Sequence, residues 1–246
     1  MFKPVAVGID TDFKFYTDTP PGKDIDTYSK TLCQYHSLLW SKPLPGGMSF
    51  DLVASKSAPY FLSYFSERGD QRLTSDSIIH TFSRWKDLGM VEIIGSFAED
   101  EIREFYDLGT TIAGYIIFPG SIVDKKPTIN GIRGMHPRIR DRFDLTLECI
   151  RLWYKREKSP LFDHLERYRS FFELFDNFDG YVEFFLLDDY LTAKDEVRFF
   201  LPFTGFVTNP IPHTVGEYMG YKKAVMDIAL ARKSRIEDFL KKRGAM

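Results

Sequence analysis

Apolar residues in the first half of the chain recur at two spacings, one typical of helices and one typical of strands. Helical spacing predicts a helix from about Asp26 to Trp40, a second helix capped by Ser75 or Asp76, and a third over residues 98–108. The second predicted helix carries Ile78, Ile79, Phe82 and Trp85. Short apolar runs predict strands over residues 50–53, 60–65 and 111–118, the last of them buried. Helices and strands are therefore mixed in this half.

The second half is predicted to be mostly helical. His136-Pro137 suits the start of a long helix that reaches about Lys158, since proline is favoured in a first helical turn. Further helices are predicted from Ser159-Pro160 and over residues 215–243, with one short strand at 197–201. Residues 178–191 are apolar enough for a buried helix or a strand, and a helix is favoured. Basic and acidic residues alternate along the last helix, which predicts a solvated outer element.

These patterns favour a single α+β domain, rich in helix, with a small sheet. It spans residues 1–246, with an irregular lead-in at 1–24 and an outer C-terminal helix at 215–246. A chain of 246 residues that is 43% hydrophobic can bury a full core. No repeat or linker divides it.

Several common sites have no counterpart in the sequence. GxxxxGK[ST], GxGxxG, GxSxG and HExxH motifs are all missing, and the five histidines are scattered without metal-ligand spacing. We therefore expect no metal and no cofactor. The N-terminus lacks the layout of a signal peptide and no apolar run is long enough to cross a membrane, so a cytoplasmic protein is expected.

Positive charge gathers between an apolar strand and a predicted helix, in residues 116–154. Six Lys or Arg residues and one acid, Asp141, lie between positions 125 and 142, in a chain of net charge −2. Glycines in this loop and the N-terminus of the following helix favour an anionic ligand. The predicted phosphate-binding side chains are Arg133, His136, Arg138 and Arg142. Alternatively, the eight acids of residues 173–196 neutralise these bases internally.

Three polar residues are candidates for chemistry at such a ligand. Asp144 follows the basic loop by one or two helical turns, and a carboxylate there can orient water or stabilise a sugar cation. Asp76 is the other candidate acid, and Asn130 is suited to position the water. Ion pairing along the helix also explains Asp144, and N-capping also explains Asp76. Trp40 and Lys42 could together supply a stacking ring and a phosphate contact, although Trp40 also suits the core.

Five segments give the chain a family resemblance. They are YHSLLWSKPLP, TSDSIIHTFSRW, IIFPG, TINGIRG and RFDLTLECIR, and they resemble a bacterial family of unknown function over nearly the whole chain. The chain is also similar to a bacterial antiphage DNA glycosylase that removes glucosylated hydroxymethylcytosine from phage DNA. The resemblance assigns no catalytic residue, because the water-activating motifs of uracil glycosylases are absent.

The resemblance and the residues together favour a hydrolase that excises a modified base from double-stranded phage DNA and leaves an abasic site. Base excision needs no metal or nucleotide cofactor. A basic groove would hold the DNA backbone, and aromatic rings would receive the flipped nucleotide. Two alternatives stay open: an N-glycosidic hydrolase or transferase acting on a free nucleotide such as NAD, and a nucleic-acid-binding or sensor protein without turnover.

Overall fold

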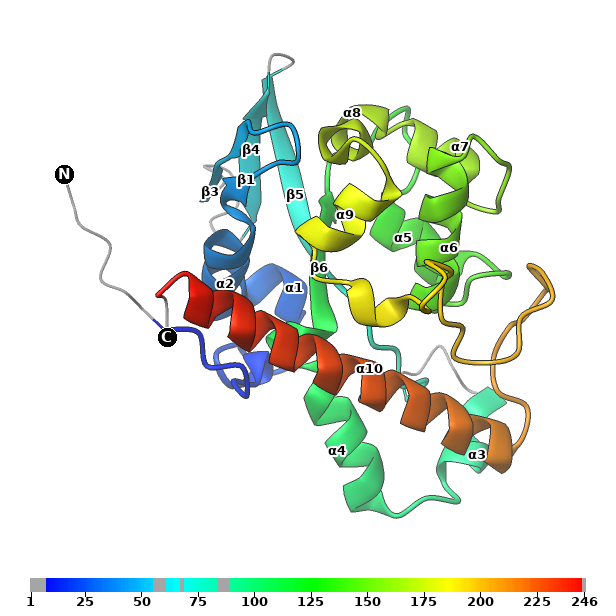
Figure 1. Ribbon diagram of the computed structural model, residues 1–246. Helices are drawn as coiled ribbons and strands as arrows, with labels where there is room; N and C mark the ends of the chain where they lie inside the picture. The colour runs from blue at the N-terminus through cyan, green and yellow to red at the C-terminus, as the bar shows by residue number, and fades with distance from the viewer. Residues whose placement is uncertain (1–7, 55–60, 67–68, 84–88, 245–246) are drawn as a thin grey trace.

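A four-stranded antiparallel sheet, in the order β3-β4-β5-β6, runs through the protein (Figure 1). The computed structural model describes residues 8–54, 61–66, 69–83 and 89–244. The strands are β3 (Leu52–Ala54), β4 (Leu62–Ser66), β5 (Gly69–Ser77) and β6 (Tyr115–Pro119), and a separate two-stranded sheet pairs β1 (Lys42–Pro43) with β2 (Ser49–Phe50). All five residues of β6 are buried, as its apolar sequence predicts.

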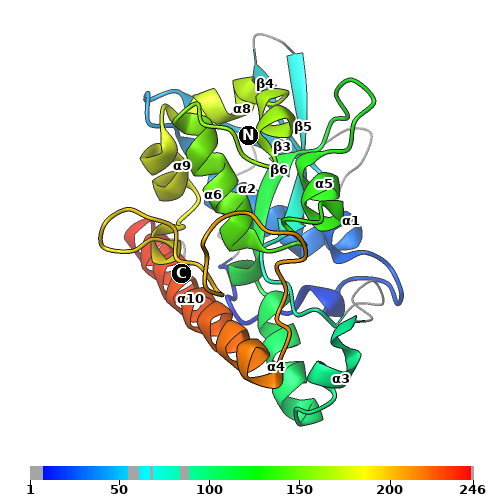
Figure 2. The same ribbon diagram turned by 90° about the vertical axis from the view of Figure 1, so that its right-hand side faces the viewer.

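Helices cover this sheet and make up most of the remaining regular structure. The α-helices are α1 (Ile25–Tyr28), α2 (Lys30–Trp40), α3 (Val91–Ile94), α4 (Glu99–Gly109), α5 (Ile129–Met135), α6 (Phe143–Tyr154), α7 (Phe162–Glu166), α8 (Arg169–Phe172), α9 (Phe178–Phe184) and α10 (Val215–Lys242). Short 3-10 turns are η1 (Phe15–Thr17), η3 (Ile112–Gly114), η4 (Glu173–Phe175) and η5 (Asp188–Tyr190). Helices α6 to α9 lie together beside the sheet (Figures 1 and 2). The end of α2 packs against the end of α9, where the ring centroids of Trp40 and Phe185 lie 5.3 Å apart. The fold is one compact α+β domain, as predicted.

The predicted helix after Asp76 is wrong. Asp76 lies inside β5, opposite Ile116 of β6, and the strand continues to Ser77. The described residues that follow, 78–83, are irregular, and Ile78, Ile79 and Phe82 are buried without a helix. Apolar residues in a short segment fit a buried loop as well as a helix, so spacing alone misled the prediction. Trp85 lies outside the described residues.

The boundaries predicted around His136 are also wrong. Part of the predicted loop before it is a helix, and the long helix predicted to start at it begins later. Residues 129–135 form α5, whose N-cap Thr128 accepts a hydrogen bond from the Gly131 N–H. The long helix begins only at Phe143, because Arg140 and Asp141 have φ angles of +49° and +64°. Such left-handed residues cannot continue a right-handed helix.

Other predicted boundaries vary in their accuracy. Helix α2 ends at Trp40 and α4 covers residues 99–109, both as predicted. The predicted helix 178–191 divides into α9 and η5, and the predicted one after Ser159 divides into α7 and α8. The predicted strand at 197–201 is reduced to a single bridge between Leu191 and Val197.

Helix α10 is not only an outer element, because one side of it is buried. Arg232 has no exposed surface, and its guanidinium donates to the carbonyl oxygens of Ala113 at 2.7 Å and Tyr115 at 2.9 Å. A further bond goes to Phe185 O at 3.2 Å. The helix crosses the front of the molecule in Figure 1 and thus ties the start of β6 to the end of α9. The alternating charges of α10 correctly predict that one side is exposed, but they give no sign that the other side, with Arg232, is buried.

Within the described residues, no helix is both long and apolar enough to cross a membrane.

Candidate active site

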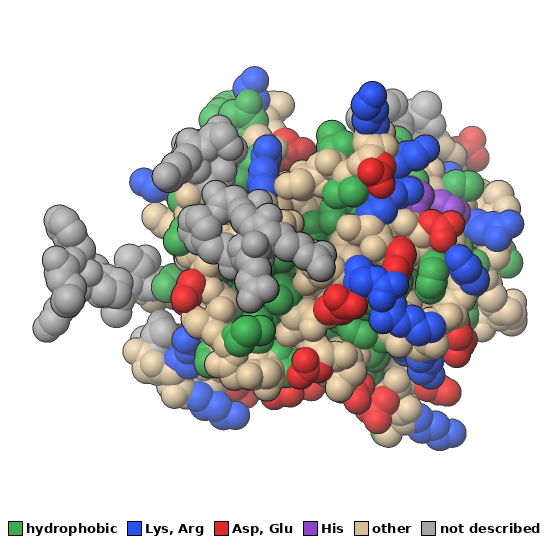
Figure 3. All heavy atoms as spheres, turned by 90° about the horizontal axis from the view of Figure 1, so that it is seen from above, with side chains coloured by type: hydrophobic (Ala, Val, Ile, Leu, Met, Phe, Trp, Pro, Cys, Tyr) green, Lys and Arg blue, Asp and Glu red, His purple; other side chains and the backbone are tan. Residues whose placement is uncertain are grey.

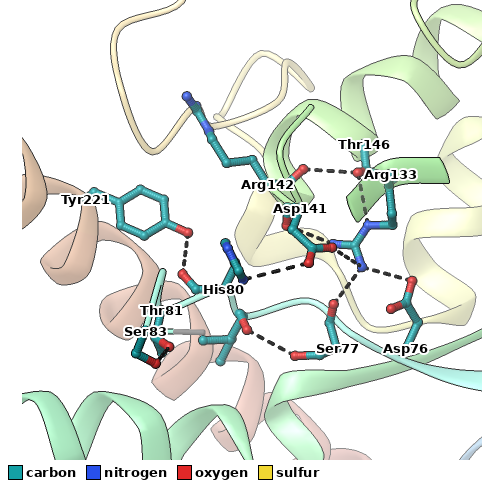
Figure 4. Close-up of polar contacts among 11 residues, drawn as sticks. Asp76, Ser77, His80, Thr81, Ser83, Arg133, Asp141, Arg142, Thr146 and Tyr221 are labelled. Carbon is teal, nitrogen blue, oxygen red and sulfur yellow. Dashed lines mark hydrogen bonds and ion pairs between the residues drawn. The ribbon is translucent and has the colours of Figure 1, made fainter. Parts of the chain in front are cut away.

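Arg133 is the centre of a buried polar network that joins three segments distant in the sequence (Figure 4). Its side chain is fully buried, and Nη1 lies 2.9 Å from Asp76 Oδ2 and donates to Ser77 O at 2.7 Å. Nη2 donates to Asp141 O at 3.1 Å, and Nε donates to Thr146 Oγ1 at 3.3 Å. Burial alone would lower the pKa of Arg133, but Asp76 and Asp141 outweigh it and raise this pKa above its ordinary value. The guanidinium is therefore a fixed positive charge.

The turn between α5 and α6 carries Asp141 into this network. Asp141 donates its backbone N–H to Arg133 O at 3.0 Å, and this bond holds the left-handed turn. Its carboxylate Oδ1 lies 3.7 Å from Arg133 Nη1, and Oδ2 lies 3.8 Å from His80 Nδ1. His80 is buried in turn, and its carbonyl accepts a hydrogen bond from the Tyr221 hydroxyl at 2.7 Å. The carboxylate and the imidazole are thus held beside each other by backbone contacts.

A small cavity of about 20 Å³, which we call the Asp141 cavity, opens beside this network. Its volume suits one water molecule. It is lined by Asp26, Asp76, Ser77, Ile79, His80, Asn130 and Asp141. These residues come from α1, the end of β5, the loop after β5, α5 and the turn before α6. Asp26 and Asn130 are half-buried, whereas Asp76 and His80 are buried.

The chemistry of the cavity lining combines negative charge with groups that can hold and deprotonate water. Three carboxylates share the fixed charge of Arg133, so the cavity carries excess negative charge if all three are ionised. A positively charged transition state would be stabilised there. Asn130 can orient water, and Asp141 beside His80 offers two groups that can accept its proton.

Two of the three predicted catalytic residues, Asp76 and Asn130, meet in this cavity, and Asp144 does not. Asp144 is fully buried, and the Arg142 guanidinium binds both of its carboxylate oxygens. Its Oδ2 also accepts the Phe200 N–H at 3.0 Å. Any chemical role for Asp144 would require this pairing to break.

The predicted binding residues lie in four separate places. Arg133 is the buried centre described above. Arg142 is only 3% exposed, and its Nη1 donates a hydrogen bond to Pro210 O at 3.0 Å. Trp40 is fully buried, and Lys42 lies over its ring in a different cavity. His136 and Arg138 remain at the surface.

His136 and Arg138 belong to a surface cluster that we call the basic patch, made up of Lys126, His136, Arg138, His164 and Arg167. Burial lowers the pKa of His164, and the nearby charges of Arg167, His136 and Lys126 lower it further, against the opposing charge of Asp163. Burial and Arg138 likewise lower the pKa of His136. Figure 3 shows histidine side chains on one face with Lys and Arg side chains near them and acidic side chains among these. Lys126 and Arg138 are exposed, and it is these two side chains that present positive charge to solvent.

The acid-rich residues 173–196 do not neutralise the basic patch within the described residues. Glu173 lies 3.5 Å from Arg169, and Asp189 pairs with Arg235 at 2.8 Å. Among the described side chains, Lys126, Arg138 and Arg167 form no ion pair. The alternative of internal neutralisation therefore does not hold for this patch.

Sequence reasoning missed Asp26, His80 and Asp141 as members of the site. Asp26 falls at the start of a predicted helix, where its residue type is expected, and His80 falls within the predicted helix after Asp76, which the structure does not contain. Asp141 was counted only as the single acid of the basic loop. No spacing in the sequence indicates that a left-handed turn carries Asp141 back to the end of β5.

Comparison with known proteins identifies the family of the chain but does not indicate an activity. Residues 9–236 match the model of DUF6994, a family of unknown function. No curated protein and no solved structure matches the chain. Among the described residues, no group of three or more His, Cys, Asp or Glu side chains is arranged to hold a metal ion.

Proposed function

The chain belongs to this family of unknown function, and we propose that it is a DNA glycosylase-type hydrolase that acts at the Asp141 cavity. The observation that carries the proposal is the lining of this cavity: three carboxylates, an amide and an imidazole around space for one water. Cleavage of an N-glycosidic bond develops positive charge on the sugar, which carboxylates can stabilise.

The proposed reaction needs only water and the nucleotide. Water bound by Asn130 and Asp141 loses a proton to the Asp141–His80 pair, and its oxygen bonds to C1′ of the sugar. The bond between C1′ and the base breaks, and the base leaves with the electron pair and takes up a proton. Asp26, half-buried at the cavity, faces the sugar cation. Asp76 and Arg133 act as positioning residues, since they hold Asp141 in place.

The basic patch supplies the reason to prefer DNA as the substrate. Its unpaired cations suit the phosphates of a nucleic-acid backbone. A cavity of about 20 Å³ is too small for a base. The target nucleotide would therefore be flipped out of the duplex and bound at the mouth of the cavity, not inside it. The choice of modified cytosine in phage DNA, and a role in defence against phage, come from the family resemblance alone.

The proposal is tested by incubating the purified protein with phage DNA that carries modified or unmodified cytosine. Abasic sites and an equal amount of released base, measured by mass spectrometry, are the expected products. Asp141→Asn and Asn130→Ala should each lower the rate by about 100-fold or more, which is typical of lost acid–base groups. Asp227→Asn, an exposed change outside both the cavity and the basic patch, is the matched control and should retain the rate.

Two other outcomes would replace this function with one of the alternatives. Loss of NAD or another free nucleotide, with DNA untouched, would indicate an N-glycosidic hydrolase of free nucleotides. Salt-sensitive DNA binding without abasic sites, at high protein concentration, would indicate a binding protein without turnover.

A further inference from the structure

Lys42 places its amine among three aromatic rings in a second cavity, which shares no residue with the Asp141 cavity. Its Nζ lies 4.6 Å from the ring centroids of Phe184 and Phe239, and 5.3 Å from that of Trp40. These rings come from α9, α10 and the end of α2. The side chain is thus fixed by helices on three sides.

The Lys42 amine has no polar partner among the described residues. Other lysines that reach the protein interior or its edge are paired, as Lys222 is with Glu101 and Lys233 with Asp12. Lys42 forms neither a hydrogen bond nor an ion pair there. An amine without an acceptor has little to compensate for its lost hydration when it is charged.

Opposing effects act on the charge of this amine. Lost hydration and the nearby guanidiniums of Arg243 and Arg232 favour the neutral form. The ring faces and the carboxylates of Glu183 and Asp188 favour the ammonium form. Burial is the largest influence, and together these effects lower the pKa of Lys42 to about 7. A substantial fraction of the amine is therefore neutral and nucleophilic at neutral pH.

The cavity beside Lys42 has a volume of about 310 Å³ and a largely apolar lining. Leu44, Pro45 and Leu186 supply apolar walls, and the exposed carboxylate of Glu183 also lines it. The space fits a small hydrophobic molecule, with one acid beside the amine.

We propose that Lys42 and this cavity form a site that captures a small aldehyde or ketone with a hydrophobic body as a covalent imine. The amine lone pair attacks the carbonyl carbon, and the carbonyl oxygen takes up a proton. The resulting carbinolamine loses this oxygen as water, with Glu183 donating and then recovering the proton, and a carbon–nitrogen double bond remains. No oxidant or further reactant is required.

The test is covalent trapping on the full-length protein. The protein is incubated with 3-phenylpropanal and cyanoborohydride at pH 7, and labelled lysines are quantified by peptide mass spectrometry. Lys42 should be labelled about tenfold faster or more than exposed Lys125, because its pKa is lowered to about 7 and a neutral amine is the nucleophile. The rate at Lys42 should rise with pH and approach half its maximum near pH 7.

Three controls make the result decisive. The preference for Lys42 over Lys125 should vanish in denaturing urea. The preference should also be smaller with glycolaldehyde, which has no hydrophobic body. Glu183→Gln should slow labelling at Lys42 and leave Lys125 unchanged. Equal labelling of Lys42 and Lys125 in the folded protein, or a preference that survives urea, would overturn the proposal.

Discussion

The Arg133 guanidinium lies 2.9 Å from the Asp76 carboxylate and so connects α5 to the last residues of β5. The two residues are far apart in the sequence, and both side chains are almost completely buried. Arginine suits this position better than lysine, because its planar fork also reaches Ser77 O, Asp141 O and Thr146 Oγ1. This single side chain therefore fixes the geometry on which the Asp141 cavity depends.

Arg133→Met should lower the free energy of unfolding by about 3–5 kcal/mol, because it leaves buried carboxylates without their counter-ion. Urea denaturation at neutral pH measures the change. The matched control is Arg138→Met, at an exposed arginine, which should shift stability by no more than about 0.5 kcal/mol. Equal losses in the two variants would contradict the role given to Arg133.

Asp144→Asn should also destabilise the protein, by about 3 kcal/mol, although it changes no volume. It removes the charge that compensates buried Arg142 and weakens the bond from the Phe200 N–H. Thermal unfolding of this variant beside Asp163→Asn, which changes an 81%-exposed carboxylate, isolates the effect of burial. A normal melting temperature for Asp144→Asn would show that the Arg142 pair is not needed for the fold.

The sequence predicted those elements whose apolar pattern matches a single secondary structure. The end of α2 at Trp40 is set by the prolines and glycines that follow, and β6 is short, apolar and bounded by proline. The segment after Asp76 failed because its residues are buried in an irregular path. Burial gives the same apolar pattern in a loop, a strand or a helix.

The candidate site was predicted only in part, for a related reason. Asp76 and Asn130 were found because their residue types suggested chemistry, but Asp141 and His80 meet them through tertiary contacts. The left-handed φ of Asp141 brings it there. This conformation is uncommon for any residue other than glycine, so it is not predicted at a given aspartate even though aspartate is enriched in it. The run of positive charge in the sequence also hides a difference among its arginines. Arg133 and Arg142 are buried, while Arg138 is exposed.

Two helical glycines should respond to alanine in opposite directions. A Cβ at Gly180 in α9 would lie 2.2 Å from Phe175 O, so Gly180→Ala should destabilise the protein by about 1–3 kcal/mol. A Cβ at Gly220 in α10 meets no atom within 4 Å, so Gly220→Ala should stabilise it by about 0.5–1 kcal/mol. Urea midpoints of the pair give the comparison, and a gain in both would contradict the close contact at Gly180.

Acid should destabilise the protein partly through His36. This buried side chain accepts a hydrogen bond on Nδ1 from Trp40 Nε1 at 2.8 Å, so it is neutral in the folded state. Burial, and then the charge of Arg232, lower its pKa from 6.5 to about 3. The unfolded state therefore binds the extra proton first, and stability falls as pH drops from about 6.5 towards 3, by at most about 1.4 kcal/mol per pH unit.

His36→Gln keeps an acceptor for Trp40 and removes the titrating group, so it should flatten this dependence between pH 6 and pH 4. Urea denaturation at several pH values measures the slope. His213→Gln is the matched control, because His213 is exposed, and it should leave the slope unchanged. A His36→Gln protein as acid-sensitive as the unmodified chain would assign the loss to other groups.

DNA binding, if it uses the basic patch, should weaken steeply with salt. Arg138→Ala and Lys126→Ala should each reduce the slope of log affinity against log salt by about one, because each removes one phosphate contact. Fluorescence anisotropy with a short duplex between 50 and 200 mM salt measures the slope. Lys223→Ala is the matched control, since Lys223 is also exposed but pairs with Asp227 at 2.7 Å. A uniform change across all three variants would indicate attraction by net charge alone, and no change in any of them would place DNA on another surface.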